Sequence, residues 1–267
     1  MKKTPLVILL VIFAASVFAG TIAPFSPETM NTEMISQPPG GEYLFGTDSM
    51  GRDLFSLVLY GGRASLYIGL LSGLIATALA IVYGTISGLA GKRLDDFLMR
   101  LVELLMSVPS ILLIIFLQAI WGNATYTSLS VVIGVTSWMN ISKMVRSEVK
   151  QLRSSDYLLA AKTMEAGFWY MLRVHLLPNF ISSIMFMVVT NIGQAMITES
   201  TLSFLGLGLP LSAVSWGSLL SMSQEMLLSN CWWIIVIPGA VLIVTLVCIT
   251  EIGEQVRQKT NRLYSNL

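Results

Sequence analysis

The amino-acid sequence predicts an all-α membrane protein with about six transmembrane helices. Of the 267 residues, 54% are apolar and only 12% are charged, and the mean hydropathy is +0.74. A soluble globular domain is roughly 25% charged. The apolar residues gather in runs near the ~20 residues that a spanning helix needs. The basic residues fall almost wholly on one side of these runs, which is the pattern of a multi-pass protein.

The first apolar run covers residues 6–23 and follows Lys2 and Lys3. A secretory signal peptide is one interpretation, because residues 17–19 resemble a small-residue cleavage site. The run is long for a signal core, however, and further spans follow it. We therefore expect residues 1–24 to form a retained N-terminal transmembrane anchor.

Residues 25–62 form the one long polar stretch of the sequence. It contains Pro27, Pro38 and Pro39, and prolines at this density break helices. We expect an extracellular or periplasmic loop here. Asp48, together with the neighbouring residues 52 and 53, forms a charged group beside glycines that either orders this loop or touches a solute-binding protein, and internal ordering is the favoured reading.

The remaining apolar runs predict a transmembrane core over residues 63–252 and a cytoplasmic tail over 253–267. Each run is long enough for one span or nearly so. In the second span, glycines recur at spacings that suit close helix packing. The five runs cover residues 64–90, 101–121, 129–144, 180–205 and 232–250.

The basic residues predict which side of the membrane each segment occupies. With six spans both termini lie on one side, and cytoplasmic segments carry an excess of Lys and Arg. If the termini are cytoplasmic, only Arg52 and Arg63 of the 16 basic residues lie outside. The sequence therefore predicts a multi-pass protein of the cell (inner, cytoplasmic) membrane with cytoplasmic N- and C-termini.

The segment between the fourth and fifth spans, which we call the 150–179 loop, is too polar to span the membrane. It is also too apolar for a linker that makes no contacts. Apolar residues from Leu158 to Met164 recur at helical spacing. Gly167 interrupts the run, a second short apolar face follows, and Pro178 ends it. Apolar surface outside the bilayer indicates either a partner-binding surface or an amphipathic helix lying on lipid, and the residues alone leave both open.

Several motifs in this sequence carry a resemblance to a known family. The 150–179 loop contains DYLLAA and then HLLPN, which resemble the "EAA" loop of ABC importer permeases in its dipeptide, oligopeptide and nickel branch. Other segments are similar to signatures of the same branch and occur in the same order. They are FGTDSMGRD at 45–53, LYGGRASL at 59–66, ESTLSFLGLG at 199–208 and SWG at 215–217.

The resemblance implies a type I ABC importer permease fold, of the second or C-type subunit, with cytoplasmic coupling helices. It implies a sister permease, one or two cytoplasmic ABC ATPases and a solute-binding protein as partners, besides membrane lipid and without nucleic acid. The solute would be a peptide, nickel or a metal chelate. The ATPase-coupling residues would be Asp156, Tyr157, Ala160, Ala161, Glu165, Gly167, Phe168, Trp169, Leu172, His175 and Pro178.

The sequence departs from the family pattern at two positions of the 150–179 loop. Leu159 stands where the family usually has Glu, and Glu165 stands where it has Gly. Gly167 follows two residues later. Because glycine supplies backbone freedom at a turn between helices, its changed position leaves the geometry of the turn open, although a turn is still expected.

The chain carries no pattern for its own chemistry. The glycine and lysine at 91–92 lack the flanking residues of a phosphate loop, so the resemblance assigns ATP hydrolysis to another subunit. The single histidine, His175, and two distant cysteines, Cys231 and Cys248, fit no metal or catalytic pattern. We expect no enzyme activity, no cofactor and no metal site.

Three polar residues in the fifth span are candidates for the translocation path. Glu199 is an acid within a membrane segment, which is functional by default, although it could instead be a fixed hydrogen-bonding partner for a neighbouring helix. Asn191 and Gln194 could line the path or bond across helices. The rival class, a self-contained channel or secondary transporter, often has inverted repeats, and we see none. A membrane-anchored enzyme would need clustered catalytic groups.

Overall fold

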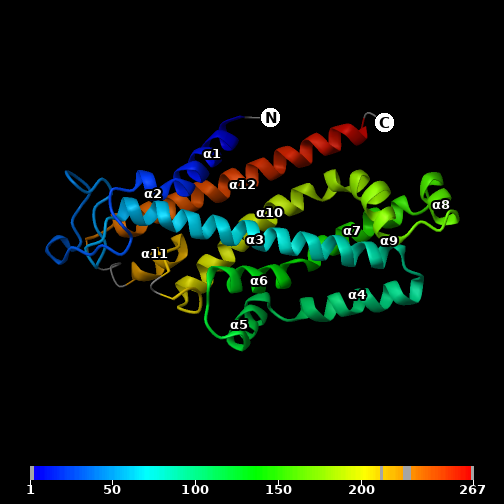
Figure 1. Ribbon diagram of the computed structural model, residues 1–267, viewed down its shortest axis with the longest axis horizontal. Helices are drawn as coiled ribbons and strands as arrows, with labels where there is room; N and C mark the ends of the chain where they lie inside the picture. The colour runs from blue at the N-terminus through cyan, green and yellow to red at the C-terminus, as the bar shows by residue number, and fades with distance from the viewer. Residues whose placement is uncertain (1–2, 211–212, 225–229, 266–267) are drawn as a thin grey trace.

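The chain is all-helical throughout the part that this computed structural model describes, as the sequence predicts (Figure 1). The described residues are 3–210, 213–224 and 230–265, with backbone only for residue 162 and residues 260–265. The α-helices are α1 Lys3–Val17, α2 Ala19–Ile22, α3 Leu54–Leu89, α4 Lys92–Ser107, α5 Ser110–Trp121, α6 Tyr126–Ser137, α7 Met139–Leu152, α8 Asp156–Thr163, α9 Phe168–Tyr170, α10 Leu177–Phe204, α11 Trp216–Met222 and α12 Trp233–Ser265. A 3-10 turn, η1, covers Thr32–Met34, and a π-helical segment, η2, covers Met171–Leu176.

The helices form an elongated bundle with two different ends (Figure 1). The long helices α3, α10 and α12 run along it. At one end, here called the loop end, lie the segment between α2 and α3 and the short helix α11. At the other end, the α8 end, α8 projects from the bundle with α9 beside it, and α1 and α12 both direct their terminal ends toward this side.

Glycines allow α3 to pack against two neighbouring helices at close range. A Cβ added at Gly84 would lie 2.6 Å from the carbonyl oxygen of Ser142 on α7. A Cβ added at Gly69 would lie 2.6 Å from the side chain of Met196 on α10. The packing role that the glycine spacing predicts is therefore confirmed at both contacts.

The described part of the structure contains fewer helices of spanning length than the sequence predicts. Three helical stretches are long and apolar enough to cross a membrane: Leu54–Leu89, Phe168–Phe204 and Trp233–Lys259. A fourth crossing arises if α4 and α5 count together, and these two are bent by 88°. The first and fourth predicted spans correspond to the shorter apolar helices α1 and α6. The six-span count thus stays a prediction.

Residues 101–121 were expected to form one span, but the chain bends within them. Pro109 lies between α4 and α5 and cannot continue the first helix. A proline has no N–H to donate, and in a helix its ring clashes with the carbonyl of the residue four positions earlier. Hydropathy registers only the apolar run and not its direction. The expected third span is therefore a broken one.

Two long helices extend into the segments that the sequence assigned to the loop and to the tail. Helix α3 begins at Leu54 rather than at 63, because the side chain of Asp53 caps it and accepts a hydrogen bond of 2.9 Å from the amide of Ser56. Likewise, α12 continues into the expected tail as far as Ser265.

The segment before α3 is folded on itself. The carboxylate of Asp48 pairs with the guanidinium of Arg52 at 2.7 Å, and both side chains are buried. It also accepts a hydrogen bond of 2.8 Å from the amide of Met50. The indole of Trp233, at the start of α12, donates to the carbonyl of Thr47 and fixes the loop to the bundle. The expected internal ordering of these charges is confirmed.

Candidate functional site

The 150–179 loop forms the helix, turn and helix that its apolar spacing predicts. Helix α8 is followed by α9, and α9 continues through η2 into α10. The stretch Phe168–Phe204 is therefore one helical rod that joins the loop to the interior of the bundle. Because the helix is continuous, a displacement of α9 would be transmitted along it to the middle of α10.

The turn, whose geometry the sequence left open, lies at Glu165, two residues before Gly167. Glu165 has a φ of 55°, in the left-handed region. The amide of Ala166 donates to the carbonyl of Ala161 at 3.1 Å, which is the six-residue closure of a Schellman helix end. Gly167 has an ordinary φ of −65° and caps α9. Glutamate thus occupies the conformation that glycine adopts most easily.

One face of the loop anchors it to the bundle. Leu158, Ala161, Leu172 and Leu176 are buried. Three of these four belong to the apolar cluster that also contains Val149 of α7 and residues of α10. Leu172 therefore faces the bundle, whereas the resemblance groups it with the ATPase-coupling residues. Phe168 is partly buried against the same cluster.

The opposite face of the loop presents large apolar side chains to the outside. Met164 is 82% exposed and Trp169 is 62% exposed. Tyr157, Leu159 and Tyr170 are also exposed. We call these five residues the loop patch. Because the loop is anchored by its other face, the loop patch is a surface that the described part of the chain leaves uncovered.

The junction between loop and rod contains the other predicted residues. His175 lies between two aromatic rings, with centroids 6.0 Å from Tyr157 and 5.6 Å from Tyr170. Its carbonyl accepts a hydrogen bond from the side chain of Asn179 at 2.5 Å. Pro178 lies in the first turn of α10. The π-helical widening just before it removes the clash that a proline ring makes with an α-helical carbonyl four residues earlier.

Two of the three predicted path residues share a cavity. Asn191 and Gln194 line a space of about 310 Å³ between α10, α6, α7 and the α4–α5 bend. Gln194 is exposed, and so is Asn140 of α7, which lines the same cavity. The Nδ2 atom of Asn191 is buried and has no hydrogen-bond partner in the described part of the chain.

Glu199 lies apart from that cavity, in a cluster of serines. It is completely buried. Its Oε1 atom accepts hydrogen bonds from Ser203 at 2.9 Å and from Ser215 at 2.7 Å. Ser65 of α3 donates to Oε2 at 3.5 Å. These contacts join α3, α10 and the start of α11, which is the arrangement of a fixed link between helices. A role for Glu199 in the path stays a prediction.

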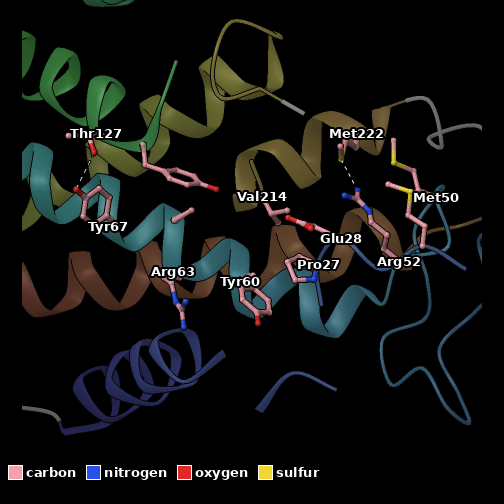
Figure 2. Close-up of a pocket in the computed structure, with 13 residues that line it drawn as sticks. Pro27, Glu28, Met50, Arg52, Tyr60, Arg63, Tyr67, Thr127, Val214 and Met222 are labelled. Carbon is pink, nitrogen blue, oxygen red and sulfur yellow. Dashed lines mark hydrogen bonds between the residues drawn. The ribbon is translucent and has the colours of Figure 1, made fainter. Parts of the chain in front are cut away.

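The loop end carries a larger hollow, whose lining the sequence did not indicate (Figure 2). It is an open cavity of about 870 Å³ beside the outer face of α3. Arg52 lies in its wall. The guanidinium pairs with Asp48 and also donates to the sulfur of Met222 at 3.2 Å. Tyr60 and Tyr67 of α3 line it. The bundle therefore has a hollow at the loop end and a projecting helix at the α8 end.

Sequence reasoning also missed an ionic cluster at the start of α4. Asp95 accepts hydrogen bonds from Arg146 and Lys150 of α7 and from Ser87 of α3. The pattern of local charges gave no signal for it, since the partners are far apart in the chain.

An all-helical bundle with several apolar spans, an exposed helix pair and a partly polar cavity open to its surface fits a multi-pass membrane transport component. Residues 80–260, more than half of the chain, match the family described as "Binding-protein-dependent transport system inner membrane component". The chain belongs to this family and is a permease component of an ABC importer. It is therefore a multi-pass inner-membrane protein and not itself an ATPase. ATP hydrolysis takes place on a separate subunit, and a solute-binding protein is a further partner of such importers.

Individual relatives agree with this assignment. The chain is 33% identical over 249 residues to the dipeptide transport system permease protein DppC of Bacillus subtilis, covering 93% of this chain and 78% of that one. It is 31% identical to the oligopeptide transport system permease protein OppC of the same organism, covering 94% and 82%. Family membership sets aside the self-contained channel or secondary transporter.

Solved structures show the same fold. A chain of the MetNI methionine ABC transporter in an inward-facing conformation superposes with a TM-score of 0.59, at 15% identity, over 76% of this chain and 96% of that one. A chain of an amino acid ABC transporter with histidines superposes with a TM-score of 0.54, at 12% identity, over 76% and 94%. At these identities the similarity concerns the fold alone.

Proposed function

We propose that this chain is the C-type permease of a heterodimeric importer and that the loop patch binds a cytoplasmic ATPase. In this proposal the chain spans the membrane six times with cytoplasmic termini, and the α8 end faces the cytoplasm. The loop patch carries the proposal. It exposes Trp169 and Met164 on a loop whose other face is fixed to the bundle.

A protein partner explains the loop patch better than a lipid surface does. The patch lies on α8, which projects at this end of the bundle (Figure 1), and on the neighbouring α9. An amphipathic helix that lies on lipid would bury one apolar face at the membrane boundary. Exposed tryptophan also suits a protein partner, because tryptophan and tyrosine dominate protein–protein interfaces. The continuous rod Phe168–Phe204 would then carry a movement of the ATPase into the membrane.

The cavity beside Asn191 and Gln194 is the candidate for part of the translocation path. Uncharged polar side chains in apolar helices are costly unless they face water, a solute or another helix. Exposed Gln194 and Asn140 satisfy that condition if this face of the bundle meets a sister permease across an aqueous path. The path would then be shared between the two permeases.

Short peptides are the proposed solutes. Two relatives that match nearly the whole chain are named for dipeptide and oligopeptide transport. No relative described here is named for nickel or a metal chelate, so those solutes have no such support. A solute-binding protein would deliver the peptide at the loop end, where the hollow of about 870 Å³ opens.

Copurification from the native membrane tests the proposal. We expect the tagged chain to bring down a second permease, one or two ATPases and a binding protein that holds a peptide. Trp169→Ala should lose the ATPases while it keeps the second permease. Trp232→Ala is the matched control, because this tryptophan is 56% exposed at the opposite end of the bundle. Isolation of the wild-type chain without any ATPase would refute the proposal, as would equal loss of the ATPases in the control.

A further inference from the structure

An ionic cluster joins three helices next to the 150–179 loop. The side chain of Asp95, in the first turn of α4, is 3% exposed. Arg146 of α7 donates to it through two nitrogens, at 2.5 and 2.7 Å, and Lys150, one turn further along α7, forms a second ion pair. Ser87, in the last turn of α3, donates at 2.7 Å. One carboxylate is therefore shared by two cations and a hydroxyl from two other helices.

The surrounding packing makes α3 and α7 one rigid pair. A Cβ added at Gly88 of α3 would lie 2.7 Å from the side chain of Val149, so the two backbones are as close as glycine permits. Helix α4 is attached less closely. Besides Asp95, its described polar contact with α3 is the hydrogen bond of 2.8 Å from the hydroxyl of Tyr83 to the carbonyl of Leu98. The cluster is thus the main polar attachment of α4 to this pair.

The position of the cluster connects the loop to the cavity. Helix α7 ends at Leu152, and α8 begins at Asp156. Lys150 therefore lies at the base of the 150–179 loop. In the other direction, α4 leads from Asp95 to the bend at Pro109, and the bend lines the same cavity as Asn191 and Gln194.

We propose that Asp95 is a positioning residue that makes α4 move together with α7 and α8, so that a displacement of α8 by the ATPase reaches the α4–α5 bend beside the cavity. This inference rests on the proposed function of the 150–179 loop. It adds a second route to the covalent one along α10. With both routes in place, the bend and the middle of α10 respond to the same displacement.

A purely stabilising role is the alternative, since removal of one partner of a buried ion pair destabilises proteins in general. The same helix offers a contrast. Arg100 and Glu103 form an ion pair at 3.5 Å with side chains 81% and 53% exposed. Exposed pairs of this kind contribute little. Glu103→Gln therefore changes a carboxylate of α4 in the same way but leaves the buried cluster intact.

The first test measures solute transported per ATP hydrolysed by the complete importer in proteoliposomes. We expect Asp95→Asn to lower this ratio by about tenfold, the size of an ordinary coupling between two sites, while ATP hydrolysis continues. Ser87→Ala, which removes one donor and keeps both ion pairs, should lower it less. Glu103→Gln should leave the ratio unchanged. An unchanged ratio in assembled Asp95→Asn importer would overturn the inference.

The second test uses the wild-type side chains of the cluster and does not depend on how well the variants fold. Spin labels at exposed positions 100 and 154 report the distance between α4 and the base of α8, after Cys231 and Cys248 are replaced by serine. This distance should stay constant between nucleotide-free and ATP-trapped importer. A label pair between residue 154 and the corresponding loop of the sister permease should change and confirm that the importer switches. A change in the 100–154 distance would overturn the inference.

The two proposals fail in different ways. If the wild-type complex shows no ATP-dependent uptake, the proposed function is wrong. If uptake is normal and only the expected effects at Asp95 are missing, the proposed function stands and the positioning role of Asp95 is wrong.

Discussion

Replacement of Glu165 by glycine should stabilise the turn of the 150–179 loop. Glu165 has a φ of 55°, and the left-handed region costs a non-glycine residue about 1 kcal/mol. Glycine adopts this region without that cost. Glu165→Gly should therefore stabilise the closed turn by most of this free energy, and the population of the opened turn should fall accordingly. A difference of about 1 kcal/mol corresponds to a factor of about five in an equilibrium constant.

Amide hydrogen exchange measures this effect at the bond that closes the turn. The amide of Ala166 donates to the carbonyl of Ala161, so it exchanges only when the turn opens. In Glu165→Gly it should exchange about fivefold more slowly than in wild type. Glu165→Ala keeps the Cβ atom and removes the rest of the side chain with its charge, so it should show no such slowing.

Gly167→Ala is the matched control because this glycine lies in the same loop but has an ordinary backbone conformation. Gly167 has a φ of −65°, and no atom lies within 4 Å of an added Cβ. The substitution should leave exchange unchanged or slow it slightly, since alanine loses less backbone entropy on folding than glycine. Faster exchange in Glu165→Gly, or an opened loop in Gly167→Ala, would refute this account of the turn.

Three further substitutions test the packing and the buried charges. Gly84→Ala should lower the unfolding temperature by forcing α3 away from α7, at a cost of ~1–3 kcal/mol, whereas Gly91→Ala, with open space around its Cβ, should not. Asp48→Asn leaves the guanidinium of Arg52 buried without its counter-ion; it should destabilise the loop end by about 3 kcal/mol, visible as faster proteolysis of the loop. Glu199→Gln should cost about 1–2 kcal/mol of stability but leave transport per assembled importer unchanged, and a loss of transport without a loss of stability would instead indicate a role in the path.

The helical content and the loop were predictable because both depend on local patterns. An apolar run indicates a helix in lipid regardless of its neighbours. The spacing of Leu158 and the residues after it likewise fixes one helical face. That face was expected to point outward, however, and in the structure its buried members attach the loop to α7 and α10. Periodicity shows that a face is apolar, but not what covers it.

The position of the turn was not predictable from residue preference. Glycine is favoured in the left-handed region by only about 1 kcal/mol, and the contacts of Leu158 and Ala161 with the rest of the chain can outweigh so small a difference. The place where α8 must end is set by these contacts. Glu165 then takes the backbone conformation that the helix end requires.

The buried polar clusters were only partly predictable. Glu199 was identified because an acid in an apolar run stands out in the sequence, although its serine partners come from three elements. Asp95 was missed because it lies among other charged residues at the start of α4 and looks like part of a solvated face. Its partners Arg146 and Lys150 are 51 and 55 residues away, and no local pattern connects positions so distant.

Uptake of a labelled dipeptide into proteoliposomes tests the central claim most directly. The vesicles would contain this chain, its sister permease and the ATPases, with the binding protein outside and ATP inside. We expect uptake that requires ATP and that Trp169→Ala abolishes, while Trp232→Ala retains it. Uptake at the full rate without ATP, or by this chain alone, would contradict the claim that the chain is an ATPase-driven permease subunit.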